Sequence, residues 1–596
     1  MNKLNTINNH VTRLNGFLPF NFDVNFAELF FENAELDSEF HIDTMAFKTL
    51  KEATFDLELG TIILTGNAGH GKTHVCALLL SEIGGFTLSE AQTFLSSQDS
   101  HTKKVKYANN SNLRIIKDLS DFSLSPASNI LLESTTDDAT KTIICANDGH
   151  LRKAVEEAGL TTIIDLLDES VRSGQMVSPD GSVALINLNH QSVVAGEGRQ
   201  SILSQVFSHW VHKEERWAIC GQCPSMESCP IFYNRELLAE TEGEEGSRFK
   251  AIKALLEIVE QSGHLITIRE LLLYISYLMT GGLSCGEVHK KVEDSESDNT
   301  WQWDYLFHQT AFGDKLSSDE LRRRPSFSGI RKVDPGYRSI REKDERIGSN
   351  ERLGKFPPQN LTPEESDPKT SKEKRKAAAT HTNRWREIRR RQFFESQSGI
   401  SSETHVDLGR QVGLGNIESF KALISGTISK QERRRVRDTI IKGLESLQGI
   451  HRSGERGDLY IANQAFLRST DTTVVGGKVP LSRIQLLPLS EVWRWRNRTS
   501  KGATICDSID WIERSLILSL NGDNLDTGSC IELKIHEFEL LMTTANGLRS
   551  EQFFAPEIRR LLNQLGKFTD ADTEASQLTV FSGLSRHDLI LDGETI

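Results

Sequence analysis

A glycine-rich run near the start of the chain contains the residues with the clearest capacity for chemistry. The run is Gly66-Asn67-Ala68-Gly69-His70-Gly71-Lys72-Thr73, followed by His74, and it fits the pattern G-x-x-x-x-G-K-T. Glycines let successive backbone N–H groups converge on an anion, and a lysine brings an ammonium group to the β- and γ-phosphates of a nucleotide. The hydroxyl of Thr73 is a ligand for Mg²⁺. We therefore expect residues 66–74 to bind a nucleoside triphosphate, with ATP and Mg²⁺ as cofactors.

The segments on either side of this run favour the same interpretation. Residues 61–65 form a short β-branched stretch, and residues 75–80 are apolar and able to form a helix. A strand, a glycine-rich turn and a helix are the context that a P-loop requires, which a chance glycine-rich turn lacks. The positive end of the helix adds to the attraction for phosphate.

Two polar side chains follow predicted strands further along the chain. Residues 113–118 read as a strand that ends in Asp118, with Asp121 as a second choice, and residues 141–146 read as a strand followed by Asn147. Parallel strands bring their carboxyl ends to one edge of a sheet, where ligands bind. We expect Asp118 to hold Mg²⁺ and polarise the attacking water, and Asn147 to orient that water. The alternative is that both residues are ordinary turn formers or helix caps.

A cluster of cysteines indicates a metal site. Cys220, Cys223 and Cys229 follow the pattern C-x₂-C-x₅-C. We take His212 as the fourth ligand of a Zn²⁺ site, with His209 or Cys285 as alternatives. An iron–sulfur cluster uses similar thiolates, and reduced thiols without any metal are the remaining interpretation.

The middle of the chain changes in composition. Apolar positions at helical spacing predict a helical lid over residues 249–281. From about residue 313 to residue 395 the chain is polar and basic, with arginine runs at 322–324 and 384–391. We expect a flexible linker that contacts DNA phosphates through residues 322–391, and the alternative is a solvated linker in which acids offset the arginines. In the mixed α+β tail, Glu532 and Lys534 after Asp526 form a weak nuclease-like set.

Length and composition limit the class of protein. The chain has 596 residues, eight cysteines, 37% hydrophobic residues and a formal net charge of −13. The first twenty residues lack the pattern of a signal peptide, and no apolar run is long enough to span a membrane. We expect a cytoplasmic protein without membrane contact. The expected division is 1–54 as a lead-in, 55–215 as an α/β nucleotide-binding core, 216–312 as cysteine cluster and lid, 313–395 as linker, and 396–596 as an α+β domain.

The motifs together resemble those of AAA+-type P-loop ATPases. The P-loop corresponds to Walker A, Asp118 to the Walker B acid, Asn147 to sensor 1, and Arg269, in the helical stretch 267–271, to sensor 2. The resemblance implies that Arg269 reaches the γ-phosphate from the lid and that Lys72, Asp118, Asn147 and Arg269 are catalytic. Walker B departs from the family pattern, because Leu119 stands where a glutamate is usual.

The layout as a whole resembles the DptF type of ATPase from bacterial phosphorothioation-dependent restriction systems. The early P-loop, the cysteine pattern with Asn234 after it, the arginine-rich middle and the mixed tail carry this resemblance. It implies an ATPase of an anti-phage DNA restriction complex, with a helicase or nuclease as partner and homo-oligomers possible. Arg152 and Arg199 are candidate fingers for a neighbouring subunit. The alternative function is a nucleotide-gated binding module with little hydrolysis.

Overall fold

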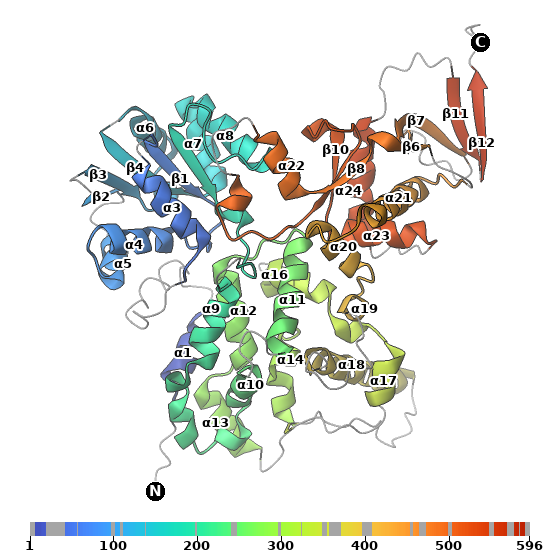
Figure 1. Cartoon of the computed structure of the whole chain (residues 1–596). Coiled ribbons are helices and arrows are strands. Elements are labelled where there is room, and N and C mark those ends of the chain that lie inside the picture. The colour runs from blue at the N-terminus through green and yellow to red at the C-terminus, as the bar shows by residue number, and fades with distance from the viewer. Residues whose placement is uncertain are drawn as a thin grey trace.

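The chain combines one large sheet of mostly parallel strands with antiparallel sheets and many helices (Figure 1). The computed structural model describes residues 6–18, 42–56, 58–96, 102–107, 111–137, 139–196, 200–239, 247–295, 300–322, 325–347, 355–356, 371–395, 408–452, 457–463, 472–498, 504–547, 554–568, 577–582 and 584–590. The predicted α/β class is confirmed in these residues, including antiparallel sheets in the C-terminal region.

The large sheet contains the P-loop strand. Its strands are β1 (Thr61–Thr65), β2 (Thr102–Tyr107), β3 (Ser111–Ile116), β4 (Thr140–Ala146) and β5 (Val183–Asn187). They lie in the order β2-β3-β4-β1-β5, and all neighbours are parallel except β2, which runs antiparallel to β3 at the edge. The sequence missed β2, because a strand with three lysines in six residues gains its stability from pairing rather than from an apolar pattern.

Helices cover both faces of this sheet, because side chains of buried strands point alternately to the two sides. One face packs against α3 (Met45–Phe55), α4 (Lys72–Ile83) and α5 (Leu88–Ser96), which meet Ile62 and Leu64 of β1. The other face packs against α6 (Leu124–Thr136), α7 (Asp148–Ala158) and α8 (Thr161–Arg172), which meet Ile63.

The register brings the strand ends to one level. Thr65 of β1 pairs with Ala146 of β4 on one side and with Asn187 of β5 on the other. Ile116 of β3 pairs with Ile144, so Asp118 follows β3 at about the level of Ala146. The residues after four parallel strands therefore share one edge of the sheet with the P-loop. The strand next to the P-loop strand is β4, which leads to Asn147, and the strand before Asp118 lies one position further away.

A helical region lies below this sheet in the view of Figure 1. Its helices are α1 (Asn9–Gly16), α9 (Ile202–Phe207), a π-helical turn (Ser208–His212), α10 (Pro230–Leu238), α11 (Ser247–Gln261), α12 (Ile268–Thr280), α13 (Cys285–Asp294) and α14 (Phe307–Thr310). By length and composition, the segment Ile268–Asp294 is apolar enough to cross a membrane, but a core helix passes the same test, and 72% of its most apolar window is buried. In α12, every residue from Leu271 to Thr280 is buried.

The basic stretch expected to be a flexible linker is helical over its described part. Its helices are α15 (Ser318–Arg322), α16 (Pro325–Lys332), α17 (Arg341–Ile347) and α18 (Ser371–Glu395). Phe393 and Phe394 are fully buried in the main core. Arg323 and Arg324 of the predicted DNA-binding segment lie outside the described residues.

Aspartates pair with arginines of α18, and one of them, Asp334, is buried. Arg390 is 1% exposed and binds Asp334 and Asp314, with Nη-to-carboxylate distances of 2.5 Å to each. Arg386 also binds Asp334, and Arg389 binds Asp344 at 2.8 Å through both Nε and Nη2. Burial opposes the charge of Arg390, yet its hydrogen bonds to the two aspartates raise its pKa overall. These arginines hold α18 in place.

The C-terminal region contains the antiparallel sheets. Its helices are α19 (Leu408–Val412), α20 (Ile417–Ile424), α21 (Lys430–Leu447), α22 (Leu489–Arg496), α23 (Ile535–Ala545) and α24 (Ala555–Leu565). Its strands are β8 (Gln485–Pro488), β9 (Leu516–Ser519) and β10 (Cys530–Leu533) in one sheet, and β6 (Asp458–Ala462), β7 (Thr472–Pro480), β11 (Gln577–Ser582) and β12 (Ser585–Ile590) in the other. The region does not stand apart, because Trp493 and Ile505 are buried in the core beneath the large sheet.

Candidate functional site

The P-loop follows β1 as an open turn that ends at α4. Gly66, Gly69 and Gly71 have φ of 145°, 95° and 81°, values that side-chain-bearing residues rarely adopt. Gly71 is the N-cap of α4, and no side chain caps that helix end. The first N–H groups of α4 are therefore available to an anion, with the positive end of the helix behind them. Thr73 is half-buried in the first turn of α4.

Lys72 is folded back onto the loop. Its Nζ donates to the carbonyl oxygens of Gly66 (2.6 Å) and Asn67 (3.1 Å) and to Oδ1 of Asn147 (3.0 Å). The side chain is 8% exposed. Burial lowers the pKa of Lys72; nearby Arg269 lowers it further, while Cys145 and Asp118 oppose the shift. The ammonium group thus occupies a site that an anionic ligand would make more favourable.

A chain of hydrogen bonds links Lys72 to the predicted acid. Asn147 accepts from Lys72 and donates through Nδ2 to Oγ of Ser120 (3.3 Å), and the backbone N–H of Ser120 donates to Oδ1 of Asp118 (2.8 Å). Asp118 caps the short 3-10 turn Leu119–Asp121, so the helix-cap alternative also holds for it. The structure therefore brings Lys72, Asn147 and Asp118 together at one edge. It adds Ser120, which the sequence reasoning missed.

Asn189 supports the loop from the other side. Its Oδ1 accepts from the backbone N–H of Asn67 at 2.8 Å. Asn189 comes two residues after the end of β5, so the strand-end rule that selected Asn147 would have selected it too.

Helix α12 of the predicted lid begins directly on the P-loop. The backbone N–H of Arg269 donates to the carbonyl oxygen of Gly69 at 3.1 Å. Thr267 caps the helix, and Glu270 completes a capping box. A Cβ atom built on Gly69 would stand 2.8 Å from Cβ of Arg269, so only glycine permits this approach. Burial lowers the pKa of Arg269. Arg269 is thus at the P-loop, as the resemblance implied.

Buried histidines and an arginine surround the back of the loop. His70 is 2% exposed, and burial, with Lys72, Arg514 and His190 nearby, lowers its pKa to about 3. Arg514, from the C-terminal region, donates to the carbonyl oxygens of Asn189 (3.3 Å), His190 (3.1 Å) and Gln191 (2.9 Å). The ring of His70 is therefore neutral at physiological pH. No sequence pattern predicted Arg514 at this site.

Arg152 and Arg199 were the candidates for an arginine finger that acts on a neighbouring subunit. Arg152 is paired within the chain, to Asp168 at 2.8 Å and to Asp148 at 3.4 Å. The hydrogen bond that Arg152 donates to Asp168 is the main reason that the pKa of Arg152 is raised. Arg199 lies outside the described residues.

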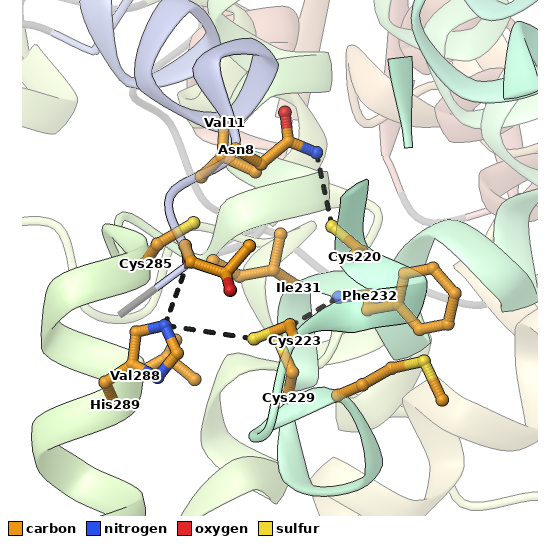
Figure 2. Close-up of a pocket in the computed structure, with 12 residues that line it drawn as sticks. Asn8, Val11, Cys220, Cys223, Cys229, Ile231, Phe232, Cys285, Val288 and His289 are labelled. Atoms are coloured by element: carbon orange, nitrogen blue, oxygen red, sulfur yellow. Dashed lines mark hydrogen bonds between the residues drawn. The ribbon is translucent and has the colours of Figure 1, made fainter. Parts of the chain in front are cut away.

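Four of the eight cysteines gather around one cavity in the helical region (Figure 2). Cys220, Cys223, Cys229 and Cys285 line one cavity together with His289. His212 is not part of its lining; its ring faces Phe207 at 6.5 Å. Of His212 and its two alternatives, His209 and Cys285, only Cys285 lines this cavity. In the described residues, no three His, Cys, Asp or Glu side chains are placed to hold a single metal ion.

The weak nuclease-like set is not assembled by these contacts. Glu532 accepts from Oγ of Ser515 at 2.6 Å, and Lys534 packs against Gly263. Both line a cavity of about 420 Å³ together with Arg514 and Trp511, whereas Asp526 does not.

Comparisons with protein-family models, with curated proteins and with solved structures found no match to this chain.

Proposed function

We propose that the chain is an ATPase that binds ATP and Mg²⁺ at residues 66–74. The observation that carries the proposal is the arrangement at one sheet edge: a loop with three left-handed glycines, a buried lysine, and the residues that follow β3 and β4. Such a loop at a helix N-terminus is a phosphate site by its backbone alone, and Lys72 adds the charge. The AAA+-like P-loop core and the helical lid belong to this proposal.

The residues present define the roles. The ammonium group of Lys72 exchanges its bonds to Gly66, Asn67 and Asn147 for the β- and γ-phosphate oxygens. Thr73 and Asp118 would hold Mg²⁺, which would supply positive charge to neutralise those oxygens. Asn147, released from Lys72, orients a water for attack on the γ-phosphorus, and the bond to the bridging oxygen breaks to leave ADP. Arg269 stabilises the charge from the lid side.

We further propose the setting that the DptF resemblance implies. The chain then couples ATP turnover to DNA handling or assembly in a cytoplasmic anti-phage restriction complex, beside a helicase or nuclease. Arg386, Arg389 and Arg390 of α18 are engaged by aspartates, so the better surface for DNA phosphates is the start of α21. Arg434 and Arg435 are exposed there. Self-association would bring a further arginine to the γ-phosphate.

A second candidate is a nucleotide-gated module with little hydrolysis. The observation in its favour is Leu119, which is fully buried directly after Asp118, where a catalytic glutamate is usual. ATP would then act by displacing the contact between α12 and Gly69 rather than by being consumed.

The test compares ATP binding and ATP turnover in matched variants. Lys72→Ala removes a charged donor and is expected to weaken ATP binding about ten- to a hundredfold. Lys51→Ala, at a surface pair with Glu82, is the control and should match the wild type. Asp118→Asn should keep binding and lose turnover. Unchanged binding in Lys72→Ala would refute the nucleotide site, and tight binding without turnover in the wild type would favour the gated module.

A further inference from the structure

The cysteine cavity joins segments that are distant in the sequence. Cys220 and Cys223 lie in and after the 3-10 turn Ala218–Gln222, Cys229 is the N-cap of α10, and Cys285 begins α13. Figure 2 shows the sulfur atoms of Cys220 and Cys285 on different sides of a shared space. All the described cysteines are free thiols, so no disulfide explains this gathering. Four cysteines around one enclosed space point to a metal centre.

The size of the space decides what kind of centre it holds. The cavity is about 20 Å³, which exceeds the roughly 10–15 Å³ that one water molecule needs. Four thiolates on a single zinc ion stand only about 2.3 Å from its centre and leave no such void. No three of these side chains are placed to share one ion. A void of this size between four cysteines favours a group larger than one ion.

The polar groups around the sulfurs are donors. Nδ2 of Asn8 donates to Sγ of Cys220 at 3.2 Å, and the backbone N–H of Phe232 donates to Sγ of Cys229 at 3.5 Å. Among the residues that the structure describes, no acid or lysine lines the cavity. Donors aimed at sulfur suit thiolates that carry negative charge on a cluster.

His289 also acts as a donor. Its Nε2 lies 3.1 Å from the carbonyl oxygen of Thr6, which can only accept, so Nε2 carries the proton. Nδ1 then accepts from Oγ of Ser225 at 2.9 Å. The same Nε2 is 3.8 Å from Sγ of Cys223. His289 is thus placed to donate to a sulfur rather than to bind a metal.

We propose that Cys220, Cys223, Cys229 and Cys285 hold an iron–sulfur cluster of the [4Fe–4S] type. The cluster has a structural consequence for the lid. Cys285 follows α12 after a short turn. Helix α10, whose N-cap is Cys229, is tied to the end of α12 by Asn234, whose Nδ2 donates to the carbonyl oxygen of Met279 at 3.1 Å. The cluster therefore fixes the end of α12 opposite to the P-loop.

The test measures metal in the full chain purified without oxygen. The wild type should contain about four iron and four acid-labile sulfide per chain, with the broad visible absorption of a cluster. Cys285→Ser should lose most of the iron. His212→Ala and Cys530→Ser, the second at a half-buried thiol in β10, should keep it.

Several outcomes would overturn the proposal: one zinc per chain, no metal at all, or full iron content in Cys285→Ser. If Cys285→Ser does not fold, the wild-type iron and sulfide content still decides. The result is independent of the proposed ATPase, because ATP binding is measured on the same preparation. Iron in the protein without ATP binding would refute only the proposed ATPase. ATP binding without iron would refute only the proposed cluster.

Discussion

Replacing Gly69 by alanine tests the contact between the P-loop and α12. The residue has φ of +95°, and a Cβ there would lie 2.8 Å from Cβ of Arg269. A left-handed conformation costs an alanine roughly 1–2 kcal/mol, and forcing a methyl group into packed space costs typically 1–3 kcal/mol. We expect Gly69→Ala to lower the free energy of unfolding by roughly 2–5 kcal/mol. If α12 moves away instead, the 3.1 Å hydrogen bond from Arg269 to Gly69 is lost.

Gly85→Ala is the matched control. Gly85 has φ of +71°, but nothing lies within 4 Å of a Cβ built there. Gly85→Ala therefore shows the free-energy cost of a left-handed alanine without a steric clash of its methyl group. Urea unfolding and ATP titration of both variants separate the two effects. Gly69→Ala should unfold at lower urea and bind ATP more weakly than Gly85→Ala. Equal urea midpoints and equal ATP affinities in the two variants would show that α12 does not rest on the P-loop as described.

Further predictions concern the buried charges and the exposed arginines. Asp334→Asn removes a fully buried carboxylate from two arginines of α18 and should cost about 3–5 kcal/mol, whereas Asp168→Asn, at a half-exposed pair, should cost about 1 kcal/mol or less in urea unfolding. The pKa of His70 is lowered from 6.5 to about 3, so below pH 6.5 the unfolded chain binds a proton that the folded chain does not, and the free energy of unfolding decreases as the pH is lowered. His70→Gln should remove about 2 kcal/mol of this decrease between pH 7 and pH 5, measured by urea unfolding at both pH values. The double variant Arg434→Glu/Arg435→Glu should keep basal ATPase activity and abolish any salt-sensitive effect of DNA on it; an unchanged DNA effect would exclude this surface.

The sequence predicted the parts of the site that local patterns encode. The strand at 61–65 was predicted to the residue, because five apolar or β-branched residues between polar segments have few other uses. Asp118 and Asn147 were placed at one edge by the rule that parallel strands end together. Ser120 and Arg514 were not predicted as site residues, because neither a serine in a turn nor an arginine more than 400 residues after the P-loop carries a local signal of where it will lie.

The composition of residues 313–395 predicted a flexible linker, whereas their described part is helical. Arginine-rich sequence with interleaved acids predicted a linker, yet Arg390 is buried between Asp314 and Asp334, which lie more than fifty residues earlier in the chain. Periodicity could not reveal this, because the partners belong to other elements and the charges cancel only in the folded chain. The same limit affected the cysteines. Spacing identified three of them, and only the fold showed that Cys285 joins them.

The candidate nucleotide site is built by three regions, and this has a consequence for how it can work. The loop comes from the large sheet, α12 of the helical region rests on Gly69, and Arg514 of the C-terminal region holds the carbonyl oxygens of Asn189 and its two successors. Asn189 in turn accepts from the N–H of Asn67. A ligand that draws this N–H toward a phosphate competes with Asn189, and one that draws Lys72 away releases Asn147. The first exchange disturbs the segment that Arg514 of the C-terminal region holds, and α12 of the lid rests on the same loop at Gly69. Occupancy of the loop is therefore coupled to the lid and to the C-terminal region by bonds that already exist without ligand.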